Sequence, residues 1–180
     1  GGTEFTNLIT TDTATVNVGD TQNTVTATLS STLTAGSDED AGSIEYTVTL
    51  THGDGFPFAP TAVAGETFSF TLNDGTSVSV TVPQGATTGS ETLSWDAAAG
   101  TSEINSLADA DVFNDTTTVS IDANGISASN NSGYENLVTA GTSTHDVTDT
   151  TAQDTVTATL TAVAGDEGGD ITYTVTLRDA

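Results

Sequence analysis

The chain has 180 residues and a formal charge of −24, because 25 Asp and Glu residues are accompanied by a single Lys or Arg, Arg178. This charge disfavours direct binding to nucleic acid or to an anionic membrane surface, and it opposes compaction unless cations from solution bind. The sequence contains no cysteine, which excludes disulfides and thiolate metal sites.

Alternating apolar and threonine residues predict strands along the chain. The stretches 24–29 and 44–50 alternate in this way, and β-branched threonine and valine suit a pleated sheet. Residues 67–72 and 77–82 flank Asn73-Asp74-Gly75, a turn sequence that tolerates the positive φ angles of a tight hairpin. This order argues against disorder, which the high charge and the apolar fraction of 34% would otherwise favour.

Further strands are predicted near Glu91–Trp95, Thr117–Ile121 and Leu137–Val147. Seven or eight short strands in about 130 residues are typical of an all-β, immunoglobulin-like β-sandwich with Greek-key connections. The Cys-Trp-Cys pattern of antibody domains is absent from the sequence, so a domain of that type is excluded.

Two strand sequences recur toward the C-terminal end. The sequence TVTATL at 24–29 recurs unchanged at 155–160, and EYTVTL at 45–50 recurs as TYTVTL at 172–177. The spacing of the two matches differs by a few residues, as loop insertions would cause. Recurrence of this kind indicates an internal repeat.

A third match links FTNLI at 5–9 with YENLV at 134–138, in the same order along the chain. The sequence therefore predicts a tandem repeat. Residues 1–20 would be the last strand of a preceding repeat, 21–150 a complete domain, and 151–180 the first strands of the next repeat. Chance similarity between threonine-rich and valine-rich strands is the alternative.

Acidic residues gather in the predicted loops rather than along strand faces. Calcium takes six to eight oxygen ligands from carboxylates, carbonyls and water, so each acidic cluster is a candidate calcium site. The first cluster, Asp38, Glu39 and Asp40, lies between the first two strands, and the acidic turn 165–170 has the matching place in the next repeat. A solvated acidic turn is the alternative.

The second cluster is Asp109, Asp111 and Asp115. Its spacing lets two carboxylates converge on one ion when the segment curls, although the glycine and distal glutamate of an EF-hand loop are lacking. Glu135 precedes the last strand of the predicted domain, and it would reach either a repeat junction or this loop.

The third cluster lies at the predicted repeat junctions and consists of Asp20, Asp149 and Asp154. An ion held there by residues from both sides would tie two rigid bodies together and stiffen the hinge between them. A plain polar linker is the alternative.

Catalytic constellations are not evident. The two histidines, His52 and His145, are not accompanied by a nucleophile-elbow sequence. A pair of catalytic carboxylates needs a cleft with an apolar surround, whereas the acidic residues here lie among glycines in polar turns. We therefore predict that the chain is not an enzyme.

Four segments, 111–115, 134–138, 147–150 and 171–177, resemble the repeats of giant RTX adhesins. These adhesins are exported by type I secretion in Gram-negative bacteria, and they include Lap-type biofilm adhesins and an ice-binding adhesin. The resemblance implies an immunoglobulin-like extender domain at the cell surface, in which calcium within and between repeats stiffens a stalk. The expected partners are neighbouring repeats and calcium ions, without nucleic acid and without membrane insertion.

Two stretches, 52–65 and 87–106, look enlarged relative to such repeats. They keep open a second function, in which the module itself binds a glycan or a peptide. Trp95, Phe56 and Phe58 are the candidate aromatic contacts for such a ligand. Each has a structural alternative, since Trp95 is expected to lie in the core and the two phenylalanines to cover a sandwich edge.

Overall fold

The computed structural model describes residues 13–19, 22–107, 115–122, 125–129, 134–149 and 155–179. In this part of the chain the protein is all-β, and its one helical element is the short 3₁₀ turn η1 (Asn105–Leu107). None of the described residues forms a helix long and apolar enough to cross a membrane.

The strands are β1 (Thr24–Leu33), β2 (Ala41–His52), β3 (Glu66–Thr71), β4 (Ser77–Val82), β5 (Thr88–Asp96), β6 (Thr101–Ser102), β7 (Thr116–Ser120), β8 (Ser127–Ala128), β9 (Asn136–Ala140), β10 (Thr144–Thr148), β11 (Val156–Ala164) and β12 (Ile171–Asp179).

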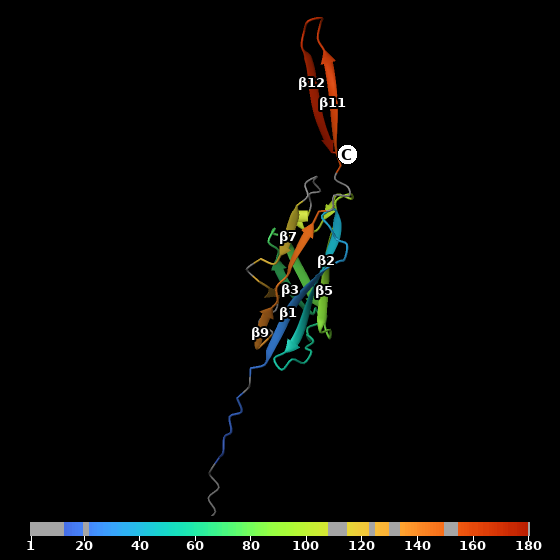
Figure 1. Ribbon diagram of the computed structural model, residues 1–180. Helices are drawn as coiled ribbons and strands as arrows, with labels where there is room; N and C mark the ends of the chain where they lie inside the picture. Colours follow the sequence, from blue (N-terminus) through green and yellow to red (C-terminus); the bar gives the residue numbers. More distant parts are fainter. Residues whose placement is uncertain are drawn as a thin grey trace, which may run out of the picture.

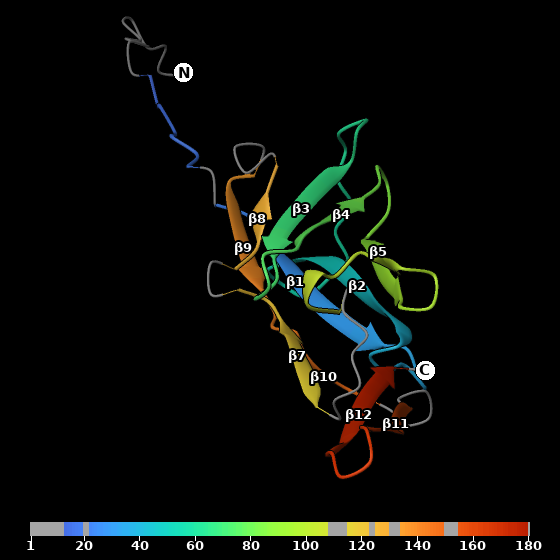
Figure 2. The same ribbon diagram turned by 90° about the horizontal axis from the view of Figure 1, so that it is seen from above.

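The strands β1–β10 form two layers, seen in Figures 1 and 2. One layer is a sheet in the order β6-β5-β2-β1-β9, antiparallel except for the β1–β9 pair. The other layer contains β4-β3-β8 and the β10-β7 pair, and a bridge between Leu72 and Ile121 connects them. The arrangement is β-sandwich-like.

Alternate residues of each strand point into the space between the layers and form one core. On β2 and β3 these include Tyr46 and Phe70, whose ring centroids are 5.2 Å apart. Trp95 of β5 is also buried, in agreement with its predicted core position. The period-2 alternation in the sequence therefore marks the buried faces correctly.

The predicted strand 137–147 is two strands rather than one. The break occurs at Gly141, which has a φ of 112° and lies so close to the backbone of Leu29 that a side chain would collide with it. At this position the chain leaves the sheet of β9, where it pairs with β1, and enters the other layer as β10, where it pairs with β7.

The stretch 87–106, predicted as an enlarged loop, is instead largely part of the sheet. Strand β5 occupies Thr88–Asp96, longer than the predicted Glu91–Trp95, and it pairs along nine residues of β2. Residues Ile104 and Leu107 then return to the core. The first part of β5, residues 88–92, contains no apolar side chain, so apolar alternation did not indicate the strand's full length.

The last two strands form a hairpin whose register matches that of the first hairpin. Leu29 pairs with Val48 in β1–β2, and Leu160 pairs with Val175 in β11–β12. Figure 1 shows the β11–β12 hairpin beyond one end of the sandwich. Its apolar side chains are exposed, whereas their counterparts on β1–β2 are buried.

The contrast between the two hairpins predicts unequal effects of one substitution. Leu50 is fully buried, and Leu177 at the equivalent position is 67% exposed. We expect Leu50→Ala to lower the free energy of unfolding by about 2–5 kcal/mol, because it leaves a core cavity. Leu177→Ala should change it by no more than about 0.5 kcal/mol. Urea unfolding monitored by Trp95 fluorescence measures both, and equal losses would contradict the exposed placement of the hairpin.

Asp74 ties the β3–β4 turn to η1. Its carboxylate accepts hydrogen bonds from the backbone N–H groups of Thr76 and Ser106, each at 2.8 Å. The N–H of Asn105 donates to the hydroxyl of Thr76 at 3.0 Å. Partial burial raises the pKa of Asp74, but the hydrogen bonds from Thr76 and Ser106 outweigh it and bring the pKa below its ordinary 3.8.

Because the pKa of Asp74 is lowered in the folded state, its carboxylate stabilises the fold fully at pH values above its unfolded-state pKa. This stabilisation is lost as the pH falls through its folded-state pKa. Asp74→Asn should therefore cost about 1 kcal/mol at pH 7, allowing for solvent screening, and the loss should shrink toward pH 3. Urea titrations across this range measure it. Asp54→Asn is the matched control, because Asp54 accepts a single 3.2 Å bond in an exposed turn. A cost that did not vary with pH would contradict the role of the charge.

Candidate metal centre

The turn between β1 and β2 holds three of the predicted site residues in a fixed shape. Gly36 provides a positive φ of 83°, and the carboxylate of Asp38 accepts a hydrogen bond from the N–H of Ala41 at 3.0 Å. Trp95 Nε1 donates to the carbonyl of Asp38 at 2.7 Å. The turn is thus anchored to β5, and the side chains of Glu39 and Asp40 start from a rigid backbone.

Two more predicted residues reach the same end of the sandwich through the pairing of β7 with β10. Asp115 immediately precedes β7, and Asp149 immediately follows β10. Thr116 pairs with Thr148, and the N–H of Asp149 donates to the carbonyl of Asp115 at 3.2 Å. The strand register therefore places these two carboxylate residues side by side.

Glu39, Asp40, Asp115 and Asp149 are called the end cluster below. Burial raises the pKa of Glu39, as do the charges of Asp115 and Asp149, while a hydrogen bond with Thr117 acts in the opposite direction. Burial likewise raises the pKa of Asp40, with contributions from Asp38 and Asp149. Both shifts are those of carboxylates that have lost water and gained like charges.

Three oxygens of the end cluster are buried and accept no hydrogen bond: Glu39 Oε1, Asp40 Oδ2 and Asp149 Oδ2. A buried carboxylate oxygen without a partner is costly. Protein cations cannot neutralise the cluster, because the whole chain has a single Lys or Arg. The donor set, carboxylate oxygens at a strand-end turn, is the chemistry that calcium prefers.

The described residues do not by themselves form a complete metal site, since no three acidic or histidine side chains among them are grouped closely enough to hold an ion. Four other predicted ligands lie outside the described residues. Asp109 and Asp111 belong to 108–114, next to Asp115 in the chain. Asp20 belongs to 20–21, and Asp154 belongs to 150–154.

Glu135 lies away from the end cluster. Its carboxylate accepts a hydrogen bond from the N–H of Asn23 at 2.5 Å, and its carbonyl accepts one from Gln22 Nε2 at 2.9 Å. These contacts place it at the start of β1, whereas Glu39 follows the end of that strand. Glu135 therefore lies beside the residues that precede β1, where the first junction was predicted, and not in the neighbourhood of Asp115.

Sequence reasoning missed a polar trio between the layers. Ser31 Oγ lies 2.6 Å from Ser143 Oγ and 2.8 Å from His145 Nε2, linking β1 to β10 and the turn before it. Ser31 and His145 are 114 positions apart in the chain. Only its place two residues after Leu29, in phase with the buried apolar residues of β1, hinted that Ser31 faces inward, and nothing in the sequence pairs it with His145.

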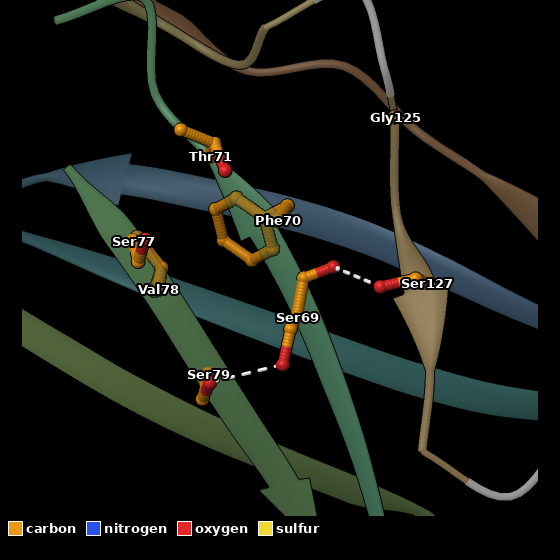
Figure 3. A pocket seen from close by; sticks show the side chains of 8 residues that line it. All are labelled: Ser69, Phe70, Thr71, Ser77, Val78, Ser79, Gly125 and Ser127. Atoms are coloured by element: carbon orange, nitrogen blue, oxygen red, sulfur yellow. Dashed lines mark hydrogen bonds between the residues drawn. The ribbon is translucent and has the colours of Figure 1, made fainter. Parts of the chain in front are cut away.

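A hollow on the outer face of β3, β4 and β8 has a volume of about 400 Å³ and is lined mainly by small hydroxyl side chains (Figure 3). Ser69 Oγ and Ser79 Oγ are 3.0 Å apart, and Ser127 Oγ donates to the carbonyl of Ser69 at 3.1 Å. The hydroxyls thus bond within the sheet surface. None of the described residues that line the hollow has a charged side chain.

Comparison with known proteins returned no relative. No protein-family model matches the chain, and no match was found among curated proteins or among solved structures. The functional argument therefore depends on the residues and their geometry.

The raised pKa of Glu39 predicts how stability depends on pH when divalent cations are removed. Because the pKa of Glu39 is raised in the folded state, the stability that its protonated form contributes is complete below the unfolded-state pKa. This stability is lost as the pH rises through the folded-state pKa. In EDTA at pH 7, Glu39→Gln should therefore be more stable than the wild type by a few tenths to about 1 kcal/mol, and the gain should vanish near pH 4.

Urea unfolding from pH 4 to pH 8 measures the effect of Glu39→Gln. The control is Glu167→Gln, which removes one charge from the exposed turn between β11 and β12 and should change stability little. If Glu39→Gln were less stable than the wild type in EDTA, the charge of Glu39 would not destabilise the folded state.

Proposed function

We propose that this chain is a calcium-stiffened spacer module of a large secreted bacterial adhesin. The observation that carries the proposal is the end cluster, in which Glu39, Asp40 and Asp149 have buried oxygens without hydrogen-bond partners. In a chain with one basic side chain, an external cation is the available source of compensation.

Calcium is the proposed ion because the donors are hard oxygens and the chain has no thiol. Residues of the end cluster would supply carboxylate ligands, and they would complete a site only together with ligands from the adjoining stretches. Asp109, Asp111 and Asp154 are proposed as further ligands from the adjoining stretches. Extracellular calcium modules bind with a Kd of about 0.1–1 mM, which suits a site that fills after export.

The position of the end cluster supports a role at a junction. Asp149 ends the β10 segment, and only residues 150–155 separate it from the β11–β12 hairpin. An ion bound there would join the turn after β1 to the chain segment leading into that hairpin. Such a link would limit bending between successive modules, as a rigid stalk requires.

The organisation and location of the whole protein are part of the same proposal. The module would be an immunoglobulin-like member of a tandem array, exported by type I secretion and displayed at the cell surface, with neighbouring repeats as its partners. The matching registers of β1–β2 and β11–β12 support the repeat. Asp20 would act at the preceding junction, where Glu135 also lies.

The alternative function, direct binding of a glycan or peptide through residues 52–65 and 87–106, has lost most of its support. Trp95 is buried and β5 occupies much of the second stretch. Phe58 packs edge-on against His52 and Tyr134, which leaves Phe56 as the exposed aromatic of the first stretch.

Calcium should raise the melting temperature of the chain, and EDTA should reverse the rise. At a calcium concentration about 100 times Kd, the expected stabilisation is about 2.7 kcal/mol, and magnesium should do less because it dehydrates reluctantly. The double variant Glu39→Gln/Asp149→Asn should lose most of this response. Thermal unfolding followed by circular dichroism measures it.

The matched control for this double variant is Asp54→Asn/Glu91→Gln, which removes two exposed charges outside the candidate calcium sites and should keep the calcium response. A melting temperature that is the same in calcium and in EDTA would overturn the proposal. A response equally lost in both double variants would show that calcium acts on overall charge and not at the end cluster.

A further inference from the structure

The outer face of β3 and β4 consists of hydroxyl side chains. Along both strands every second residue is buried in the core, and each residue between them faces outward. The outward residues are Thr67, Ser69 and Thr71 on β3, and Ser77, Ser79 and Thr81 on β4. The neighbouring β8 adds Ser127, which pairs with Ser69. In a chain with 25 acidic residues, none of these outward side chains is charged.

The outer face of the five-stranded sheet has a different composition. It also contains cross-strand threonine pairs, such as Thr28 with Thr49, but it carries the acidic residues Glu45 and Asp96 as well. Both acids are exposed, and each follows a buried core residue of its strand. The uncharged hydroxyl surface is therefore a property of β3, β4 and β8, and it is not a general consequence of threonine-rich strands.

The hydroxyls of β3 and β4 form rungs across the two strands. Thr67 Oγ1 lies 2.9 Å from Thr81 Oγ1, and Ser69 Oγ lies 3.0 Å from Ser79 Oγ. Each rung uses one of its two hydroxyl hydrogens, which leaves one donor and several lone pairs free for a bound molecule. The rungs thus hold hydroxyl groups in fixed places with hydrogen-bonding capacity to spare.

The Ser69–Ser79 rung lies in the hollow of about 400 Å³ described above, with Ser127 and Gly125 beside it (Figure 3). The hydrogen bond from Ser127 Oγ to the carbonyl of Ser69 fixes β8 against β3 at this point. Pockets that bind small molecules have volumes of about 300–1,000 Å³, so the hollow is large enough for such a ligand. The Thr67–Thr81 rung does not line the hollow.

The chemistry of the lining favours one class of ligand. Its described residues include no carboxylate, so a cation finds no partner of opposite charge there. The formal charge of −24 disfavours anions. An apolar molecule would take water from the hydroxyls without replacing their hydrogen bonds. A neutral molecule rich in hydroxyl groups avoids all three penalties, because each of its hydroxyls both donates and accepts.

We propose that this hollow binds a neutral saccharide unit, whose hydroxyls exchange hydrogen bonds with those of Ser69, Ser79 and Ser127. The site shares no residue with the end cluster or with the stretches 52–65 and 87–106. It therefore depends neither on calcium nor on an array of modules, and it gives the side of the sandwich a function of its own. Hydroxyl contacts alone are weak, so the expected Kd is about 1–10 mM.

NMR titration of the full, ¹⁵N-labelled chain tests the proposal. The neutral probes are methyl α-glucoside, methyl β-galactoside, methyl α-mannoside and N-acetylglucosamine, each raised to about 100 mM to saturate a millimolar site. At least one should give saturable shifts of the backbone amides of Ser69, Ser79 and Ser127. Glucuronate, which adds a carboxylate to the glucose ring, should bind roughly tenfold more weakly than the glucoside. If none of the four neutral probes shifts these amides saturably, the proposal is wrong.

Two variants that remove hydroxyls from the hollow locate the contact. Ser69→Ala/Ser79→Ala deletes the rung without adding bulk and should weaken binding roughly tenfold. Ser127→Ala, on the other side of the hollow, should weaken it severalfold, and it serves as the second test if the double variant does not fold. Thermal unfolding of each variant separates loss of binding from loss of structure.

The matched controls remove the same number of hydroxyls from other places. Thr67→Val/Thr81→Val deletes the neighbouring rung of the same face, and Thr28→Val/Thr49→Val deletes a cross-strand pair of the other sheet. Both should bind the probe as the wild type does. Loss of binding in Thr67→Val/Thr81→Val equal to that in Ser69→Ala/Ser79→Ala would contradict a site in the hollow. Unchanged binding in folded variants of the hollow would overturn the proposal as well.

Discussion

Negative charge without internal compensation is the constraint on which the rest of this structure depends. With 25 acidic residues and one basic residue, the chain has to keep its carboxylates in water, give them hydrogen-bond donors, or let external cations reach them. All three solutions occur. Exposed acids stay in turns such as 165–170, Asp74 receives two backbone N–H groups, and the end cluster is left with oxygens that the protein does not satisfy.

The last two solutions have opposite consequences for stability. Asp74 stabilises the fold in its charged form, because hydrogen bonds compensate for its partial burial. Glu39 and Asp40 weaken it in their charged form, because burial and neighbouring carboxylates act together. A bound cation would reverse the second effect without touching the first. The end cluster is thus the part of the molecule whose contribution depends on the surrounding solution, which is the property expected of a site filled only after export.

The two hairpins show how the same sequence can be core in one place and surface in another. Their registers coincide and their inward residues are nearly the same, yet within the described residues only β1–β2 has a second layer against it. Strand pairing is therefore a local property that the hairpin brings with it, whereas burial is supplied by the other layer. This separation underlies the proposed array of modules.

The sequence by itself determined strands β1–β4 and their inward faces, the turn at Asn73-Asp74-Gly75 and the recurrence of the first hairpin, because alternation and turn chemistry are local. It also placed the acids in loops. Only the tertiary structure decided which acids meet: Glu39 joins Asp115 and Asp149, while Glu135 lies at the other end. It likewise decided that the chain changes layer at Gly141 and that β5 extends over 88–96. These outcomes depend on register and on close approach between segments far apart in the chain, which periodicity along one strand does not encode.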